Sequence, residues 1–403
     1  MNNTDYDTIV VGGGPSGLIS AHQVASGGHR VLVVEEHETV GKPDHCAGLL
    51  SVSGLDSLGL RPPEDVIQNH VIGARIFSPS GHHIYVERGQ REALVVDRRE
   101  FDRWLANQAI DAGASIKTGS KVTRIQRNNG RMTGVQTSGG ESSDLSASAI
   151  IDAEGSRCQI SKQARLPTVP RTSKYPAFQI EVSGADVDED IVEMYYGRST
   201  APGFFAWIIP LGDGRARVGL AAKNLAKRRL MTSIRHHPVM RERLKHVSIQ
   251  RTLGGIVLVG MPIKRTVRDN FLVVGDSAGM VKPTTGGGVI VGAMAAKVAG
   301  RIVNDALENQ SQSKMDLDEY EGAWRALLLK ELRIMYLTQK MLSSFSDKGL
   351  DSLVRDAGQY GLVETMRRVG DMDMQRRVIL RLLSNPLTIL AGLKAARFIN
   401  PLF

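Results

Sequence analysis

The N-terminal part of the chain combines short apolar runs with one helical pattern. Residues 8–11 and 31–34 each predict a buried strand, because apolar and mostly β-branched residues follow one another there without a polar interruption. Between them, residues 18–26 carry apolar side chains at helical spacing, and Gly27 and Gly28 end that helix. The order of strand, helix and strand predicts a parallel sheet covered by helices.

Farther along, strands of a different type appear. Residues 74–77 and 83–86 flank a Pro-Ser-Gly turn, which predicts an antiparallel pair. The remaining pattern predicts a helix over 99–112, strands over 113–155, a strand-rich region over 175–260, a buried parallel strand over 270–274, a long helix from near Gly286, and helices beyond about 316.

This interleaving predicts an α/β fold with a Rossmann-type FAD-binding domain, a three-layer arrangement around a mostly parallel sheet. An antiparallel-sheet substrate domain is inserted into it, and C-terminal helices follow. We assign 1–70, 96–165 and 265–315 to the FAD-binding domain, 71–95 and 166–264 to the substrate domain, and 316–403 to the C-terminal helical region.

Composition adds limits to this prediction. The 403 residues suffice for two to three domains, each large enough to bury its own core. Two cysteines are too few for a disulfide framework, which favours a reducing, cytoplasmic setting. No run of 18 apolar residues and no basic, apolar leader occur, so we expect neither a membrane-spanning helix nor a secretory signal.

The net charge of +9 is concentrated near the C-terminus. Residues 374–403 contain no acidic residue, and their basic residues are Arg376, Arg377, Arg381, Lys394 and Arg397. Many aliphatic residues lie between these cations, a combination typical of helices on an anionic bilayer surface and not of nucleic-acid arms. We therefore expect peripheral contact with an anionic membrane and no nucleic-acid partner. Two helices packed on the core remain the alternative.

A glycine motif at the first turn indicates a dinucleotide site. Gly12, Gly14 and Gly17 follow a predicted strand and open a helix, and Glu35 ends the next strand. The first glycine permits a tight turn, the second lets backbone N–H groups approach a pyrophosphate, and the third brings helix and sheet together. A carboxylate at Glu35 suits an unphosphorylated ribose, as in FAD or NAD.

Two later motifs favour FAD over NAD. Residues 274–279 (VGDSAG) follow a buried strand, and their Asp276 suits a ribityl or ribose hydroxyl. Residues 283–288 (PTTGGG) lead into a helix, whose N–H groups would face the flavin N1–O2 edge, where negative charge gathers on reduction.

At this point the chain resembles the FAD-dependent geranylgeranyl reductase family, of the archaeal digeranylgeranylglycerophospholipid type, within the hydroxylase-like flavoproteins. Residues 42–48 (KPDHCAG) are similar to the family's cysteine loop, and 96–102 (VDRREFD) resemble its Arg-x-x-Phe-Asp helix start. Residues 152–155 (DAEG) resemble the Asp-Gly motif of the class, with Glu154 in place of Asp. Residues 202–210 (PGFFAWIIP) resemble the substrate motif PxxYxWxFP, with Phe205 and Ile209 in place of Tyr and Phe.

The motifs and the resemblance together imply a set of cofactor-binding residues. They are Gly12, Gly14, Pro15, Ser16, Gly17, Glu35, Glu36, Cys46, Ala47, Gly48, Arg98, Val122, Asp152, Glu154, Gly155, Gly275, Asp276, Pro283, Gly286, Gly287, Gly288 and Val289.

The resemblance also implies the reaction, which is saturation of C=C bonds in geranylgeranyl chains of membrane phospholipid precursors. An isolated alkene accepts hydride poorly, so protonation accompanies hydride delivery and creates tertiary-cation character. Such a site needs a dry pocket, aromatic faces and a proton source. Phe205 and Trp207 are the candidate lining, and Cys46 and His45 the candidate proton sources, although Cys46 could instead only shape the pocket. No metal is expected.

A second dinucleotide motif does not occur, so electrons come from NAD(P)H binding directly or from a ferredoxin-like carrier; the sequence leaves both open. Two other functions fit the same fold: an FAD-dependent monooxygenase or halogenase, and a flavoprotein that transfers electrons to a quinone. The aromatic motif at 202–210 favours the reductase.

Overall fold

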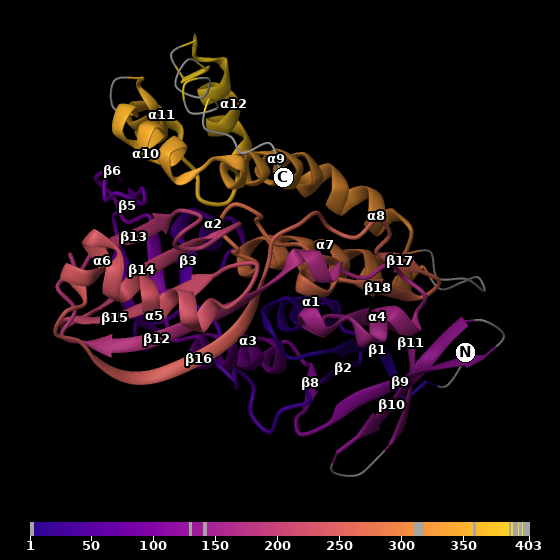
Figure 1. The fold of residues 1–403 in the computed structure, drawn as a ribbon. Helices are drawn as coiled ribbons and strands as arrows, with labels where there is room; N and C mark the ends of the chain where they lie inside the picture. The colour runs from indigo at the N-terminus through magenta and orange to yellow at the C-terminus, as the bar shows by residue number, and fades with distance from the viewer. Residues whose placement is uncertain are drawn as a thin grey trace. The chain divides into compact units, whose positions relative to one another are not determined.

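The computed structural model describes residues 4–128, 131–139, 143–309, 317–357, 360–386, 388–389, 394 and 397. The chain forms two compact units (Figure 1). The first unit comprises residues 1–44, 98–173 and 260–332, and the second comprises residues 45–97, 174–259 and 333–403. Residues 45–70 therefore belong to the second unit, whereas we assigned them to the FAD-binding domain, because strands within them pair with β7 (Ala93–Val96).

The first unit is built on a parallel sheet. Its parallel strands, in spatial order, are β18 (Phe271–Val273), β11 (Asp144–Asp152), β1 (Tyr6–Val11), β2 (Val31–Val34) and β8 (Ser115–Lys117). Three further strands pair antiparallel at its margins: β17 (Val267–Arg268) on β18, β10 (Arg131–Ser138) on β11, and β9 (Lys121–Asn128) on β10. The central parts of these strands are apolar and buried, as expected where both faces of a sheet are covered; they are residues 9–11, 31–34 and 149–151.

Helices α1 (Pro15–Ala25) and α7 (Val289–Glu308) pack closely together in this unit. A Cβ added at Gly292 would lie 2.5 Å from Ser16 Oγ, and one at Gly300 would lie 2.5 Å from Gln23 Cβ. Glycine at these two positions therefore sets the spacing of the helices. The other elements are α3 (Arg98–Asp111), η2 (Gly155–Arg157), α4 (Gln159–Gln163), η3 (Arg171–Ser173), η4 (Gly275–Ala278), α8 (Glu319–Trp324) and the π-turn η5 (Arg325–Leu329).

The second unit contains two further sheets. The larger has the order β16 (Ser248–Leu258), β12 (Lys174–Ser183), β15 (Arg215–Ala221), β14 (Phe205–Gly212), β13 (Ile191–Tyr196), β5 (Gly73–Phe77) and β6 (His83–Glu87). All its pairs are antiparallel except β13 with β5, which come from distant parts of the chain. The smaller sheet, β3 (Leu49–Ser51), β7 and β4 (Ile67–Val71), is antiparallel. The predicted fold class is confirmed.

The two faces of β14 have different coverings, because successive side chains on a strand point to opposite sides. Ala206 and Ile208 pack against Leu230 of α5 (Ala226–His236) and Met240 of α6 (Pro238–Arg243). The opposite face carries the predicted substrate motif. The remaining helices of the unit are α2 (Val52–Ser57), η1 (Glu64–Val66), the later part of α9 (Lys330–Ser344), α10 (Asp347–Asp356), α11 (Leu362–Val369) and α12 (Arg376–Ser384). No helix among the described residues is both long and apolar enough to cross a membrane.

Candidate functional site

The carboxyl ends of the parallel strands form one row in the first unit. Val11 lies opposite both Val34 and Asp152, and Asp152 lies opposite Val273. The segments that follow these strands, which begin at Gly12, Glu35, Ala153 and Val274, therefore leave the sheet at the same edge. Between β1 and β11 the strand order reverses direction, and such a switch point is where open α/β sheets bind their ligands.

The glycines of the first turn differ in what surrounds them. Gly12 has φ +101° and a Cβ there would lie 2.5 Å from the Ala153 carbonyl oxygen, while a Cβ at Gly17 would overlap the Gly12 oxygen. At Gly14, in contrast, no atom lies within 4 Å of an added Cβ. Gly14 is the N-cap of α1, with Pro15 in the first turn and no side chain capping the helix. Open space beside an uncapped helix N-terminus is what a pyrophosphate requires.

Glu35 is held firmly at the end of β2. Its side chain is buried, and its Oε2 accepts a hydrogen bond of 2.7 Å from Gly13 N, while Oε1 accepts one of 3.0 Å from His37 N. A carboxylate has about four lone-pair positions, so Glu35 can accept a further bond from a ribose hydroxyl. The neighbouring Glu36 instead forms ion pairs with Arg157 at 2.7 Å and Lys121 at 3.1 Å. Val122, next to Lys121, is buried in β9.

The segment after β11 contains Glu154, which stands where the motif of the class has Asp. Glu154 Oε1 accepts hydrogen bonds from the backbone N–H groups of Ile160, at 2.6 Å, and Ser161, at 3.1 Å, at the start of α4. A longer side chain than Asp reaches this helix, and Gly155 follows with φ +78°. Asp152 is fully buried and accepts from the Ser161 hydroxyl and Glu154 N. Burial, followed by the nearby charge of Glu154, raises the pKa of Asp152 well above its usual range.

Arg98 begins α3 and forms a bidentate pair with Asp102, in which Nε–Oδ1 and Nη2–Oδ2 are both 3.0 Å. Burial raises the pKa of Asp102 to about 6, although the Arg98 charge acts to lower it. Burial also raises the pKa of Asp276, and Arg98 again acts in the opposite direction. The Arg98 cation therefore lies close enough to both carboxyl groups to influence them.

The turn before α7 contains a polar atom that sequence reasoning missed. Gly286 N donates to the Lys282 carbonyl at 2.8 Å, Lys282 N donates to the Gly287 carbonyl at 3.1 Å, and Gly286 has φ +71°. A Cβ at Gly288 would lie 2.7 Å from Asp276 Oδ1. The buried Thr285 Oγ1 has no hydrogen-bond partner among the described residues. An unpaired buried hydroxyl beside a glycine turn fits a site whose ligand supplies the missing partner. Pro283 precedes this turn and Val289 opens the helix.

In the second unit, Arg217 of β15 anchors the cysteine loop. Its side chain is 1% exposed and donates to the carbonyl oxygens of Ala47, at 2.9 Å, and Val96, at 3.2 Å, and to Glu181 Oε1 at 2.9 Å. Gly48 has φ +76° and a Cβ there would lie 2.5 Å from Arg217 Nη1.

Within this loop, Cys46 is partly buried and its Sγ accepts a hydrogen bond of 3.4 Å from Gly48 N. His45 is exposed, and its Cβ is 3.6 Å from the position of a Cβ added at Gly255 of β16.

The predicted substrate motif places aromatic side chains in a row on one face of β14 and just before its start. Phe205 stacks on Phe204 with ring centroids 4.3 Å apart and meets Trp207 edge-on at 6.0 Å. Trp207 Nε1 donates to Gln179 Oε1 at 3.0 Å, and its ring lies directly over Gly219. Gln179 therefore fixes the indole, a role that no sequence motif indicated.

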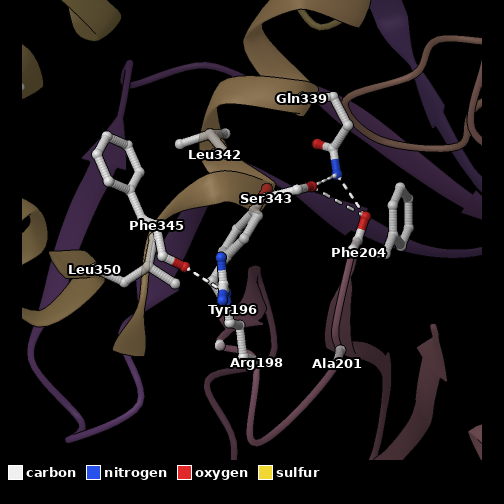
Figure 2. Close-up of a pocket in the computed structure, with 11 residues that line it drawn as sticks. Tyr196, Arg198, Ala201, Phe204, Gln339, Leu342, Ser343, Phe345 and Leu350 are labelled. Carbon is white, nitrogen blue, oxygen red and sulfur yellow. Dashed lines mark hydrogen bonds between the residues drawn. The ribbon is translucent and has the colours of Figure 1, made fainter. Parts of the chain in front are cut away.

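A small cavity of about 10 Å³ lies near one end of this row (Figure 2). Tyr196, Phe204 and Leu342 line it, and Gln339 and Ser343 of α9 bind the Gly203 carbonyl oxygen beside it, at 2.8 Å and 3.3 Å. Such a volume holds about one water molecule.

Comparison with known proteins now adds to these observations. The family model described as "Lycopene cyclase protein" matches residues 7–356. Digeranylgeranylglycerophospholipid reductase 2 of Methanothermobacter thermautotrophicus is 32% identical over 384 residues, which cover 93% of this chain and 98% of the relative. A geranylgeranyl bacteriochlorophyll reductase-like structure from Thermoplasma acidophilum has a TM-score of 0.85 at 26% identity, covering 96% and 98% of the two chains. The flavin-dependent brominase Bmp2 shares the fold alone, with a TM-score of 0.73 at 16% identity and 98% coverage of both chains.

The fold and the relatives together define the class of the protein, which is an FAD-dependent oxidoreductase. The chain belongs to the family described as lycopene cyclase protein and, within it, to the geranylgeranyl reductases, which act on C=C bonds. The resemblance stated from the motifs and the FAD cofactor are thereby confirmed.

Proposed function

We propose that this protein saturates the C=C bonds of geranylgeranyl chains carried by a membrane phospholipid precursor. The observation that carries the proposal is an aromatic row made by Phe205 and Trp207 on one face of β14 and by Phe204, which precedes the strand and stacks on Phe205. Apolar contacts continue this row from Trp207 toward Ala47 of the cysteine loop. The archaeal relatives named for digeranylgeranylglycerophospholipid support the choice of substrate.

The first unit would hold the cofactor through the groups at the strand ends. The open space at Gly14 takes the pyrophosphate, Glu35 accepts from the ribose, and Thr285 Oγ1 and the turn at Gly286 face the flavin. When bound and reduced, FAD supplies a hydride. Arg98, held in place by its bidentate pair with Asp102, would also contact the cofactor.

The second unit would bind the prenyl chain and stabilise positive charge on it. Aromatic faces attract a cation, and the Trp207 indole is fixed in orientation by Gln179 and Gly219. Phe205 stands where the family motif has Tyr, so this ring carries no hydroxyl of its own.

The proton would come from Cys46. Its thiol is partly buried in an anchored loop, and the Gly48 N–H group at 3.4 Å from Sγ stabilises the thiolate that remains after transfer. The exposed His45 is placed to return a proton to the loop from solvent. We further propose that the enzyme works in the cytoplasm and receives electrons from NAD(P)H or from a small ferredoxin-like carrier.

The direct test uses purified protein with its flavin reduced by dithionite, mixed with a geranylgeranylated glycerophospholipid without oxygen. Mass spectrometry should show the lipid gaining hydrogen in steps of one pair. Cys46→Ser should reduce turnover strongly while retaining bound FAD, and Cys158→Ser serves as the matched control because Cys158 is buried in the first unit. An unchanged lipid mass under these conditions contradicts the proposal.

A further inference from the structure

Exposed hydrophobic side chains are concentrated in one short stretch of the second unit. Ten large hydrophobic residues are exposed among the described residues, and three of them lie between positions 380 and 389. They are Leu380, Leu383 and Ile389, with 45%, 48% and 47% of their surface accessible. Scattered single apolar residues on a surface are ordinary, whereas a local group of this kind marks a contact surface.

Helix α12 has two different faces. Val378 and Ile379 are buried, and at 3.6 residues per turn they lie on the side of the helix away from Leu380. The outward side carries Leu380 and Leu383, which lie one turn apart. The inward face already satisfies the packing of the helix, so the outward leucines are left for another partner.

Exposed arginines lie on the same helix as these leucines and on the helix that packs against it. Arg376, Arg377 and Arg381 are exposed on α12, and Arg367 and Arg368 are exposed at the end of α11, which packs against α12. Arg368 also forms an ion pair with Glu364 on α11, at 2.6 Å. The face formed by these five arginines with Leu380, Leu383 and Ile389 is called the α12 face below.

The segment that leads into α12 is bound to the rest of the second unit by hydrogen bonds and apolar contacts. Asp373, just before α12, is 2% exposed and accepts a hydrogen bond from the Ser51 hydroxyl in β3. Arg88 Nη1 donates to the Gly370 carbonyl oxygen at 2.8 Å, and Met372 packs on the apolar cluster that includes Trp207. The helix that presents the exposed leucines is therefore attached to the same unit as the aromatic row.

We propose that the α12 face binds the surface of an anionic lipid bilayer, with α12 lying in the plane of the interface. Leu380, Leu383 and Ile389 enter the boundary between head groups and acyl chains, and the arginines bind lipid phosphates. Nucleic acid would satisfy the arginines but leave the aliphatic side chains in water, so an anionic bilayer fits both features better. This inference deepens the proposed function, since it names where that enzyme meets its lipid substrate.

The test measures vesicle binding without turnover, so its outcome does not depend on the proposed reaction. FAD-loaded protein is floated with vesicles of phosphatidylcholine alone and with vesicles that also contain phosphatidylglycerol. The wild-type chain should bind only the anionic vesicles, and added salt should release it. Each arginine near the surface contributes on the order of fivefold in binding, so the triple variant Arg376→Gln/Arg377→Gln/Arg381→Gln should lose most of the bound fraction.

Matched variants separate this surface from general charge. Arg228→Gln/Arg235→Gln/Arg241→Gln removes the same charge from exposed positions on α5 and α6 and should bind as the wild type does. Leu380→Gln/Leu383→Gln should lose binding while its charge is unchanged, and Leu225→Gln is its exposed apolar control. Retained FAD and an unchanged circular dichroism spectrum show that each variant is folded.

The inference is overturned if the wild type and both α12 variants float with the anionic vesicles to the same extent. It is also overturned if the α5–α6 control variant loses as much vesicle binding as the α12 variants do. Salt-independent binding of the wild type, or its failure to bind anionic vesicles at all, overturns it without recourse to any variant. Tighter binding of the wild type to nucleic acid than to anionic vesicles would assign the face to the other class of partner.

Discussion

Replacing Arg217 by Met should release the cysteine loop while leaving most of the side-chain volume in place. The guanidinium is 1% exposed and binds two backbone carbonyls, those of Ala47 and Val96, together with the side chains of Glu181 and Gln68. Methionine fills a similar space but donates no hydrogen bond.

The cost follows from these contacts. Removing one partner of a buried ion pair destabilises a fold by about 3–5 kcal/mol, and here the lower part of that range applies, because Arg251 still binds Glu181 Oε1 at 2.8 Å. The loop itself loses one hydrogen bond, from the Arg217 guanidinium to the Ala47 carbonyl oxygen, and a bond to a charged group is worth about 2 kcal/mol. Since about 1.4 kcal/mol corresponds to a tenfold change in population, the open loop should become about thirtyfold more populated.

The rate of thiol labelling at Cys46 measures opening of the cysteine loop, and urea unfolding measures the stability of the whole unit. In Arg217→Met, Cys46 should react with iodoacetamide about thirtyfold faster, while Cys158, 3% exposed, stays protected. Arg251→Met is the matched control, because it removes the other cation bound to Glu181; it should lower stability without accelerating Cys46 labelling. A wild-type labelling rate in Arg217→Met would refute the reasoning, and simultaneous labelling of Cys158 would show global unfolding instead.

Two further predictions concern the first unit. Gly14→Ala should leave the urea midpoint of the FAD-free protein unchanged, because no atom lies within 4 Å of the added Cβ, yet it should weaken FAD binding measured by fluorescence titration; Gly17→Ala, whose Cβ would overlap the Gly12 oxygen, should instead lower stability. An affinity for FAD equal to that of the wild type would show that the pyrophosphate lies elsewhere. Burial raises the pKa of Asp102 to about 6 in the folded protein. When the pKa of a carboxyl group is higher in the folded than in the unfolded protein, the group stabilises the fold fully at pH values below its unfolded-state pKa. This stabilisation is lost as the pH rises through the folded-state pKa. The free energy of unfolding should therefore fall by up to about 3 kcal/mol between about pH 4 and pH 7. Urea titrations across this range should give a smaller fall for Asp102→Asn, and an identical pH profile would contradict the assignment.

Local features of this protein could be predicted from the sequence. The strand at 31–34 and the turn at Gly12, Gly14 and Gly17 depend on residues close together in the chain, and the structure has them at those positions. Helix α1 begins earlier than the apolar pattern indicates, because Pro15 fits the first turn of a helix although it adds nothing to the periodicity.

Contacts between distant parts of the chain could not be predicted from the sequence. Arg217 binds Ala47 across 170 positions, and no pattern around either residue marks the pair. Thr285 also looks ordinary in sequence, and only its burial without a partner marks it. For Glu154, the sequence supplied part of the answer. The motif showed that this residue differs from the Asp of the family, but only the structure shows that its side chain accepts hydrogen bonds from the start of α4.

The central claim is that reduced flavin on this chain saturates a prenyl lipid. The most direct measurement mixes the dithionite-reduced holoenzyme, freed of excess dithionite, with a geranylgeranylated glycerophospholipid under anaerobic conditions and follows the flavin absorbance. The account predicts that the oxidised flavin spectrum returns at a rate that depends on lipid concentration, with one pair of hydrogens added to the lipid per flavin oxidised. A flavin that stays reduced in the presence of the lipid, with no lipid mass gain, would contradict it.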